Sequence, residues 1–121
     1  MLSRAERTEI IVEQRFYDKY GKRMFRNLKS GMDSFLRNGS GRQLYVALRT
    51  LLGPYVSGTR RIEHPRFVMT FQMEREEFTF DVDAMSLIVE VRDASGDCRF
   101  RDDAISERWI YWLPVVFGLD F

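Results

Sequence analysis

Three consecutive runs of alternating apolar and polar residues lie between Arg66 and Asp93, and they constrain the fold more than any other feature of the chain. Alternation with a period of two is typical of a strand that buries one face and exposes the other. We therefore expect a three-stranded antiparallel meander with one apolar face, which must pack against another layer. The residues expected on that face are Phe67, Met69, Phe71, Met73, Phe78, Phe80, Val82, Leu87, Val89 and Val91.

Three segments that precede the meander have the apolar spacing of amphipathic helices, at residues 4–20, 22–37 and 42–52. Gly31 interrupts the second segment and predicts either a kink or close packing at that point. The expected fold class is α+β, with two to three N-terminal helices packed on one face of an antiparallel β-meander of three to five strands.

The segment that follows the meander admits more than one secondary structure. Residues 98–101 form a candidate fourth strand. Residues 103–112 fit either a short helix or another strand, and the period of their apolar residues does not decide between the two. Asp102 and Asp103 would be good N-cap residues for the helix, and Pro114 is expected to limit it.

The length of 121 residues suits a single domain, with a helical part at about 3–52 and a sheet part at about 64–121. Cys98 is the only cysteine and His64 the only histidine, so an internal disulfide and a cysteine-based metal cage are excluded, and we predict no cofactor. The sequence shows neither an export signal nor an apolar run long enough for a transmembrane helix. We therefore expect a cytoplasmic protein with no membrane partner.

Charge is distributed unevenly along the chain, although the net charge is only +1. Residues 22–66 contain ten basic and two acidic residues, whereas residues 74–108 contain eleven acidic and five basic residues. Such asymmetry indicates a basic face and an acidic face on one domain.

The basic segment at residues 22–61 suggests nucleic-acid binding as one function, because arginine and lysine side chains can follow a phosphate backbone. Tyr45 and Tyr55 are candidates for stacking on bases. The alternative is a solvated helix face, or a basic face that pairs with the acidic face of another copy. The candidate phosphate-binding residues are Arg23, Arg26, Lys29, Arg37, Arg42, Arg60 and Arg61.

The polar face of the meander gathers three acidic residues, Asp81, Asp83 and Glu90, in an arrangement that could hold a divalent metal ion. Together with Arg92, this pattern is similar to that of the PD-(D/E)xK nucleases. The resemblance implies a metal-dependent nuclease with an upstream helical glutamate, at Glu9 or Glu13. Arg92 stands where that family has lysine, and arginine cannot shuttle a proton. The alternative is an exposed sheet face with a cross-strand ion pair.

The C-terminal segment is unusually apolar and must be buried, either in its own domain or in a partner. The candidate interface residues are Trp109, Tyr111, Trp112, Val115, Phe117 and Phe121. Tryptophan and tyrosine are frequent interface hot spots, which favours contact with a protein partner or with another copy. We therefore expect a small non-enzymatic protein-binding or assembly module that associates with copies of itself in a homo-oligomer. Nucleic-acid binding and the metal-dependent nuclease are the alternatives.

Overall fold

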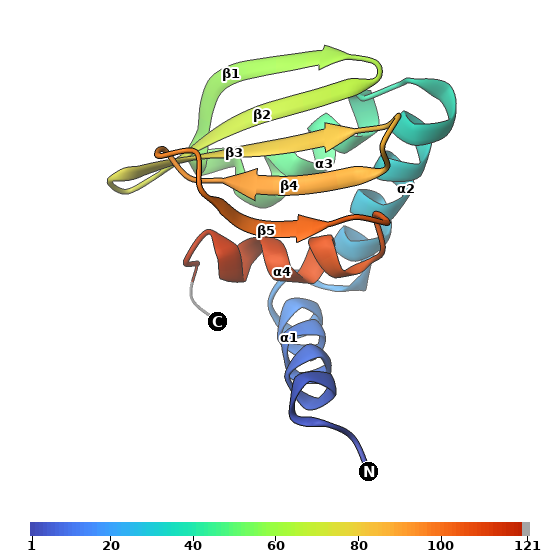
Figure 1. The fold of residues 1–121 in the computed structure, drawn as a ribbon, viewed down its shortest axis with the longest axis vertical. Helices are drawn as coiled ribbons and strands as arrows, with labels where there is room; N and C mark the ends of the chain where they lie inside the picture. The colour runs from blue at the N-terminus through green and yellow to red at the C-terminus, as the bar shows by residue number, and fades with distance from the viewer. Residues whose placement is uncertain (120–121) are drawn as a thin grey trace.

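The computed structural model describes residues 1–119, apart from the side chains of residues 57–59. It confirms the α+β fold, with three N-terminal helices, a five-stranded antiparallel meander and a C-terminal helix (Figure 1). The helices are α1 (Arg4–Tyr20), α2 (Lys22–Asn38), α3 (Arg42–Leu52) and α4 (Arg108–Val116), with a short 3-10 turn, η1 (Gly53–Tyr55). The strands are β1 (Val56–Glu63), β2 (Arg66–Met73), β3 (Glu76–Asp83), β4 (Ile88–Arg92) and β5 (Cys98–Asp102), and they pair in sequence order.

The alternation in the meander places its apolar residues on the buried face of the sheet. Phe67 pairs with Val82, and Phe71 pairs with Phe78, and all four side chains are buried. Leu87 departs from the expectation, because it lies in the β3–β4 turn with a φ of 56° and is exposed, so that β4 begins one residue later. Helices α2 and α3 cover the buried face, and α4 runs along the β5 edge (Figure 1).

Strand β1 was not expected, since the sheet was predicted to begin at about residue 64 and the strand starts at Val56. Its sequence, VSGTRRIE, shows no alternation of apolar and polar residues, and its register with β2 shifts between Val56 and Arg60. Segment 56–63 is therefore a strand because it pairs with the regular strand β2, and no pattern in its own residues predicts this.

Helices α2 and α3 approach each other closely at Gly31. A Cβ atom at this position would lie 2.7 Å from both Cα and N of Leu44. Such a distance is far below a normal van der Waals contact, so only glycine fits here. Of the two expectations for Gly31, the structure supports close packing.

Residues 103–112 divide into a loop and the start of helix α4, which begins at Arg108. Asp102 does not cap this helix: its carboxylate accepts hydrogen bonds from the backbone N–H groups of Ala104 (3.2 Å) and Ser106 (2.9 Å), and so holds the loop. The prediction that Pro114 limits the helix is also wrong, because α4 continues through it to Val116. The proline removes one backbone hydrogen bond, and the helix closes beyond it because the N–H of Phe117 donates to the carbonyl of Leu113 at 3.0 Å.

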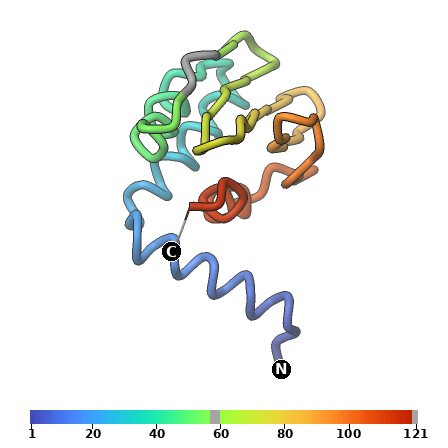
Figure 2. Tube along the Cα trace, turned by 90° about the vertical axis from the view of Figure 1, so that its left-hand side faces the viewer, coloured from blue at the N-terminus to red at the C-terminus, as the bar shows by residue number. Residues whose placement is uncertain are grey.

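Helix α1 extends away from the rest of the domain (Figures 1 and 2). A capping box formed by Ser3 and Glu6 stabilises its N-terminus. Val12 and Phe16 are the buried residues of this helix, whereas the side chains of residues 1–8 are exposed. The start of α1, up to Thr8, is therefore solvated on all sides in the single chain.

Candidate functional site

The open face of the sheet carries a row of charged side chains that we call the outer-face ladder. At its centre is Asp81, which is only 4% exposed. Nη2 of Arg66 donates to both of its oxygens, at 2.8 and 2.6 Å, and Nη2 of Arg92 donates to Oδ2 at 2.8 Å. The hydrogen bond to Asp81 is the main cause that raises the pKa of Arg92. The charge of this buried carboxylate is therefore matched by guanidinium groups from two neighbouring strands.

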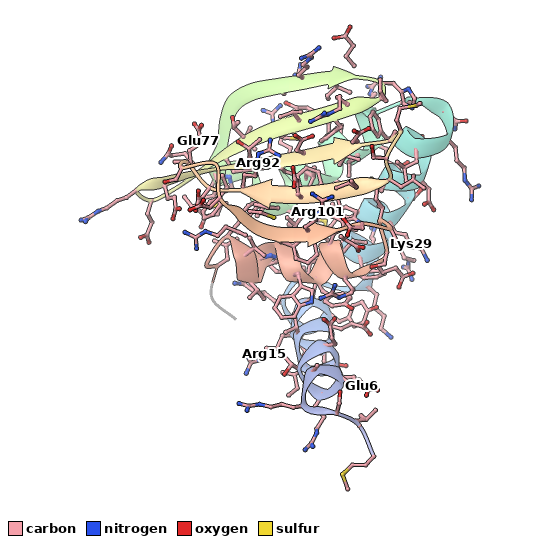
Figure 3. The ribbon with its side chains drawn as sticks, viewed as in Figure 1. Glu6, Arg15, Lys29, Glu77, Arg92 and Arg101 are labelled. Atoms are coloured by element: carbon pink, nitrogen blue, oxygen red, sulfur yellow. The ribbon has the colours of Figure 1, made fainter. Side chains whose placement is uncertain are left out.

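The ladder continues across the sheet with alternating sign. Arg66 also lies 3.9 Å from Asp83, Arg92 pairs with Glu90, and Glu90 lies 3.7 Å from Arg101. Figure 3 shows Arg92 and Arg101 on this open face. The row ends with an ion pair between Arg101 and Asp103. The register places Arg66 opposite Asp83 and Glu90 opposite Arg101, and it puts Arg92 diagonal to Asp81, so the cross-strand ion pairs follow from the meander itself.

These contacts give the predicted metal site no support. Asp81, Asp83 and Glu90 line a hollow of about 90 Å³ together with arginines, and each is already paired with a guanidinium group. Within residues 1–119, no group of three or more histidine, cysteine, aspartate or glutamate side chains is placed to hold a metal ion. Glu9, one of the two upstream glutamates that the nuclease resemblance implies, contacts α4 instead of the ladder. The nuclease hypothesis stays a prediction.

The predicted phosphate-binding residues do not form one surface. Arg23, Arg26 and Arg37 lie on the exposed side of α2, and Arg42 lies at the exposed start of α3. Lys29 is held in an ion pair with Glu107, whose hydrogen bond raises the lysine pKa.

The side chains of the two predicted residues on β1 point to opposite faces of the sheet. Arg60 stacks over the ring of Tyr45, with its guanidinium carbon 4.3 Å from the ring centroid. Arg61 lies opposite Val68 of β2, and its side chain is on the open face of the sheet, 3.4 Å from that of Glu63. The structure thus brings Arg60 against α3 and places Arg61 on the opposite face.

Half of the predicted interface residues belong to the core. Trp109, Tyr111 and Phe117 are buried within the domain, and the ring of Trp109 lies 5.7 Å from that of Phe80. Trp112 and Val115 are half-buried. Phe121 lies outside the described residues. The apolar character of the C-terminal segment is therefore explained mainly by helix α4 completing the domain.

A carboxylate on α1 joins the two ends of the fold, in a group that we call the Glu9 clamp. Glu9 accepts hydrogen bonds from Arg108 (2.8 Å), from the Tyr111 hydroxyl (3.0 Å) and from the Trp112 indole (3.1 Å). Burial alone would raise the pKa of Glu9, but these hydrogen bonds and the positive charge of Arg108 outweigh it and hold the pKa below its usual value. Sequence reasoning missed this role, because Glu9 is separated from its partners by about a hundred residues and no local pattern links them.

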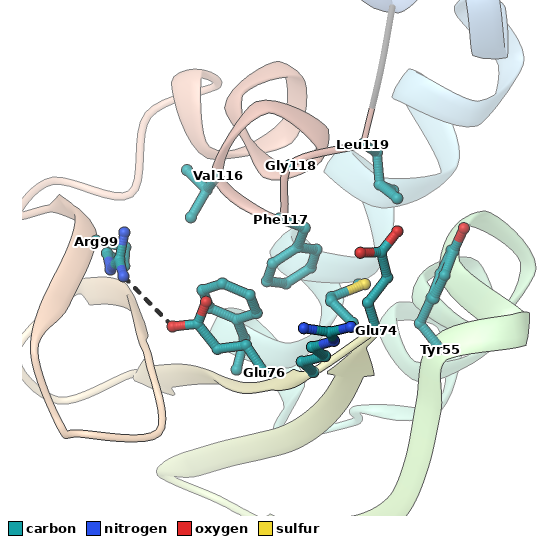
Figure 4. A pocket seen from close by; sticks show the side chains of 11 residues that line it. Tyr55, Glu74, Glu76, Arg99, Val116, Phe117, Gly118 and Leu119 are labelled. Atoms are coloured by element: carbon teal, nitrogen blue, oxygen red, sulfur yellow. Dashed lines mark hydrogen bonds and ion pairs between the residues drawn. The ribbon is translucent and has the colours of Figure 1, made fainter.

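Two hollows flank the end of helix α4. One, of about 390 Å³, lies between β5 and α4 and is lined by Phe100, Trp112, Val115, Val116 and two arginines, Arg99 and Arg108. The other, of about 420 Å³, has an apolar floor and a charged rim where Arg99 lies 3.3 Å from Glu76 (Figure 4). The first hollow is apolar enough to accept a side chain from another element; in the second, the rim charges neutralise each other.

Comparison of the chain with protein-family models, with curated proteins and with solved structures finds no match. No helix within the described part of the chain is long and apolar enough to cross a membrane. What the protein does must therefore be inferred from its own surfaces.

Proposed function

We propose that the protein is a small non-enzymatic assembly module that associates with copies of itself through helix α1. The observation that carries this proposal is where apolar side chains are exposed. Of the seven large apolar residues that are exposed in the described chain, four lie within the first eleven residues: Met1, Leu2, Ile10 and Ile11. Isolated exposed apolar residues are common, but their concentration on one projecting element is typical of an interaction site.

The same chain offers a place for this helix to dock. The hollow between β5 and α4 presents Phe100, Trp112 and Val115, so two of the predicted interface residues line it. The two arginines at its border are already paired within the chain, Arg99 with Asp93 and Arg108 with Glu9, so docking would rest on the apolar side chains. An apolar centre with charged groups at its rim is the usual arrangement of a protein interface.

Reciprocal docking of α1 between two copies would produce a closed dimer, because each copy has both the helix and the hollow. Complete burial of one isoleucine side chain contributes about 1.5–3 kcal/mol, before the entropic cost of association. Ile10 and Ile11 are each about half exposed, so the contact would be weak to moderate and the oligomer would depend on protein concentration.

Light scattering on the full chain, over a range of concentrations and at low and high salt, tests the proposal. We expect a dimer that persists at high salt, because burial of apolar surface is not screened by ions. The double variant Ile10→Glu/Ile11→Glu should be monomeric while its circular dichroism spectrum stays that of the wild type.

A matched control changes exposed apolar residues elsewhere. Met85 and Leu87 lie in the β3–β4 turn and are also exposed, so Met85→Glu/Leu87→Glu adds the same charge without touching α1. This control should remain a dimer. A wild-type chain that is monomeric at every concentration and salt would refute the proposal, and so would a dimer that the α1 variant leaves intact.

A further inference from the structure

The outer surface of helices α2 and α3 carries arginines that make no ion pair with any described residue. On α2 these are Arg23, Arg26 and Arg37, and on α3 they are Arg42 and Arg49; all five are exposed. Arg49 makes only a long hydrogen bond, of 3.4 Å, to the Tyr45 hydroxyl. Asp33 is the one acidic residue in the sequences of the two helices. The surface is therefore strongly positive, and its charge is not neutralised within the domain.

Arg23 on α2 and Arg42 and Arg49 on α3 stand on either side of a groove between the helices, and Arg26 and Arg37 extend the positive surface further around α2. The groove has a volume of about 240 Å³, and its lining includes Asn27, Gln43, Val46 and Thr50. Arg23 lies one helical turn before Asn27, so it stands on the α2 side of the groove. Arg42 and Arg49 lie about one turn on either side of Val46, so they stand on the α3 side.

We propose that this surface, which we call the α2–α3 groove, binds the phosphodiester backbone of a nucleic acid. Guanidinium groups bind phosphate oxygens through two parallel hydrogen bonds, and amide groups such as those of Asn27 and Gln43 commonly add further contacts to phosphates and sugars. The proposal does not rest on self-association, because none of these residues belongs to α1 or to the hollow beside α4.

The length of the surface favours a polymer over a small anion. Fourteen residue steps separate Arg23 from Arg37, which corresponds to about 21 Å along a helix that rises about 1.5 Å per residue. A DNA strand advances about 3.4 Å per phosphate along its axis, so the surface spans about six nucleotides. A single phosphate group would contact only one end of such a row.

An acidic protein is the competing partner, and the lining of the groove makes it less suitable. Tight protein partners are anchored by large apolar or aromatic side chains in deep pockets. The apolar part of this lining consists of Met24, Val46 and Ala47 beside polar groups, and Tyr45 next to it is already covered by Arg60. Repeated charge with few apolar anchors suits a phosphate backbone.

The test measures binding of the full chain to a fluorescent DNA duplex, and to its single strand, by anisotropy over a series of salt concentrations. We expect the logarithm of the affinity to fall linearly with the logarithm of the salt concentration. The double variants Arg23→Gln/Arg26→Gln and Arg42→Gln/Arg49→Gln should each weaken binding and reduce this slope by about 2, because each removes two phosphate contacts. Asp33→Asn should strengthen binding, because it removes the one acidic group from the helices.

The matched control is Arg61→Gln/Arg75→Gln, which removes two exposed arginines from the sheet side of the domain. It should leave both the affinity and the slope close to those of the wild type. Equal losses in the control and in the helix variants would overturn the proposal, as would a flat salt response with both probes. Equally tight binding of poly-glutamate of the same charge would also overturn it and would point to an acidic protein. The dimer-breaking change at Ile10 and Ile11 should leave the salt slope per chain unchanged, so failure of either proposal can be recognised separately.

Discussion

The two outer surfaces of the domain use the same side chain in opposite ways. On strands β2 to β5 every arginine lies within an ion pair, and the partners include the nearly buried Asp81. On the outer surface of α2 and α3, five arginines have no such partner among the described residues. The arginine charges on the sheet are neutralised by ion pairs within the domain, whereas those on α2 and α3 remain available to another molecule.

The difference follows from geometry and composition. An antiparallel sheet places residues from distant parts of the chain directly opposite each other, about 5 Å apart, so that opposite charges can pair without being close in sequence. On a helix the neighbours are three or four residues apart, and in the first half of α2 these neighbours, such as Arg23 with Arg26 and Arg26 with Lys29, have like charge. Such pairs destabilise an isolated helix by a few tenths of a kcal/mol each. The helical layer must therefore obtain its stability from packing.

The largest effect is expected when the packing of the helical layer is disturbed. Gly31→Ala would place a Cβ atom 2.7 Å from the backbone of Leu44, and separation of α2 from α3 should lower the free energy of unfolding by about 2–3 kcal/mol. Urea unfolding followed by circular dichroism measures this change. Ser30→Ala, one residue earlier on the exposed side of α2, should stay within about 0.5 kcal/mol of the wild type. Similar values for the two variants would show that close helix contact does not stabilise this layer.

On the sheet side, the largest loss is expected from removing the central charge of the outer-face ladder. Asp81→Asn would leave Arg66 and Arg92 facing each other across a neutral amide and should cost about 1.5–2 kcal/mol, since both arginines are partly solvated. The same substitution at the exposed end of the ladder, Asp103→Asn, should have no effect beyond about 0.5 kcal/mol. Equal losses at the two positions would mean that burial does not distinguish them.

A smaller, pH-dependent effect is expected at the Glu9 clamp. Because the pKa of Glu9 is lower in the folded chain than its usual value near 4.5, the clamp stabilises the fold above that pH and loses this contribution as the pH falls through the folded pKa. Glu9→Gln should reduce stability by about 1 kcal/mol at neutral pH, and the difference from the wild type should shrink as the pH falls below about 4. A difference that is constant between neutral and acidic pH would exclude an ionised Glu9 as the cause.

The smallest effect on stability is expected at the helical arginines. Arg23→Gln/Arg26→Gln should change the free energy of unfolding by less than about 0.5 kcal/mol and is expected to be slightly stabilising, because it removes a like-charge neighbour. Thermal unfolding at low salt, where the repulsion is least screened, measures the sign. A clear loss of stability would show that these side chains have structural partners, and it would remove the contrast between the two surfaces.

Much of the fold could be predicted from local periodicity, and what could not be predicted depends on distant contacts. The alternation around Phe67 and Phe80 was sufficient to define β2 and β3, because each strand carries its own pattern. Strand β1 has no such pattern, and the helix over Arg108–Val116 contains a proline that argued against it. The secondary structure of β1 and of α4 depends on the elements against which these two segments pack.

The candidate surfaces were predicted unequally for the same reason. The cross-strand ion pair between Asp81 and Arg92 follows from the register of a meander, so an ion-paired face was among the expectations. The basic residues were predicted as one group, but composition cannot show that the side chain of Arg61 points to the sheet face opposite the helices. The contacts of Glu9 with α4 could not have been predicted from any local signal.

The Glu9 clamp also has a consequence for the order of events during synthesis. Glu9 leaves the ribosome 99 residues before Arg108, which at about 5–20 residues per second is a delay of roughly 5–20 s. Throughout that time α1 can pack against α2 but not against α4, because α4 has not yet been synthesised. Glu9 therefore has none of its hydrogen-bond partners. Nascent chains on one messenger could therefore meet through their first helices before any of them has closed its own clamp.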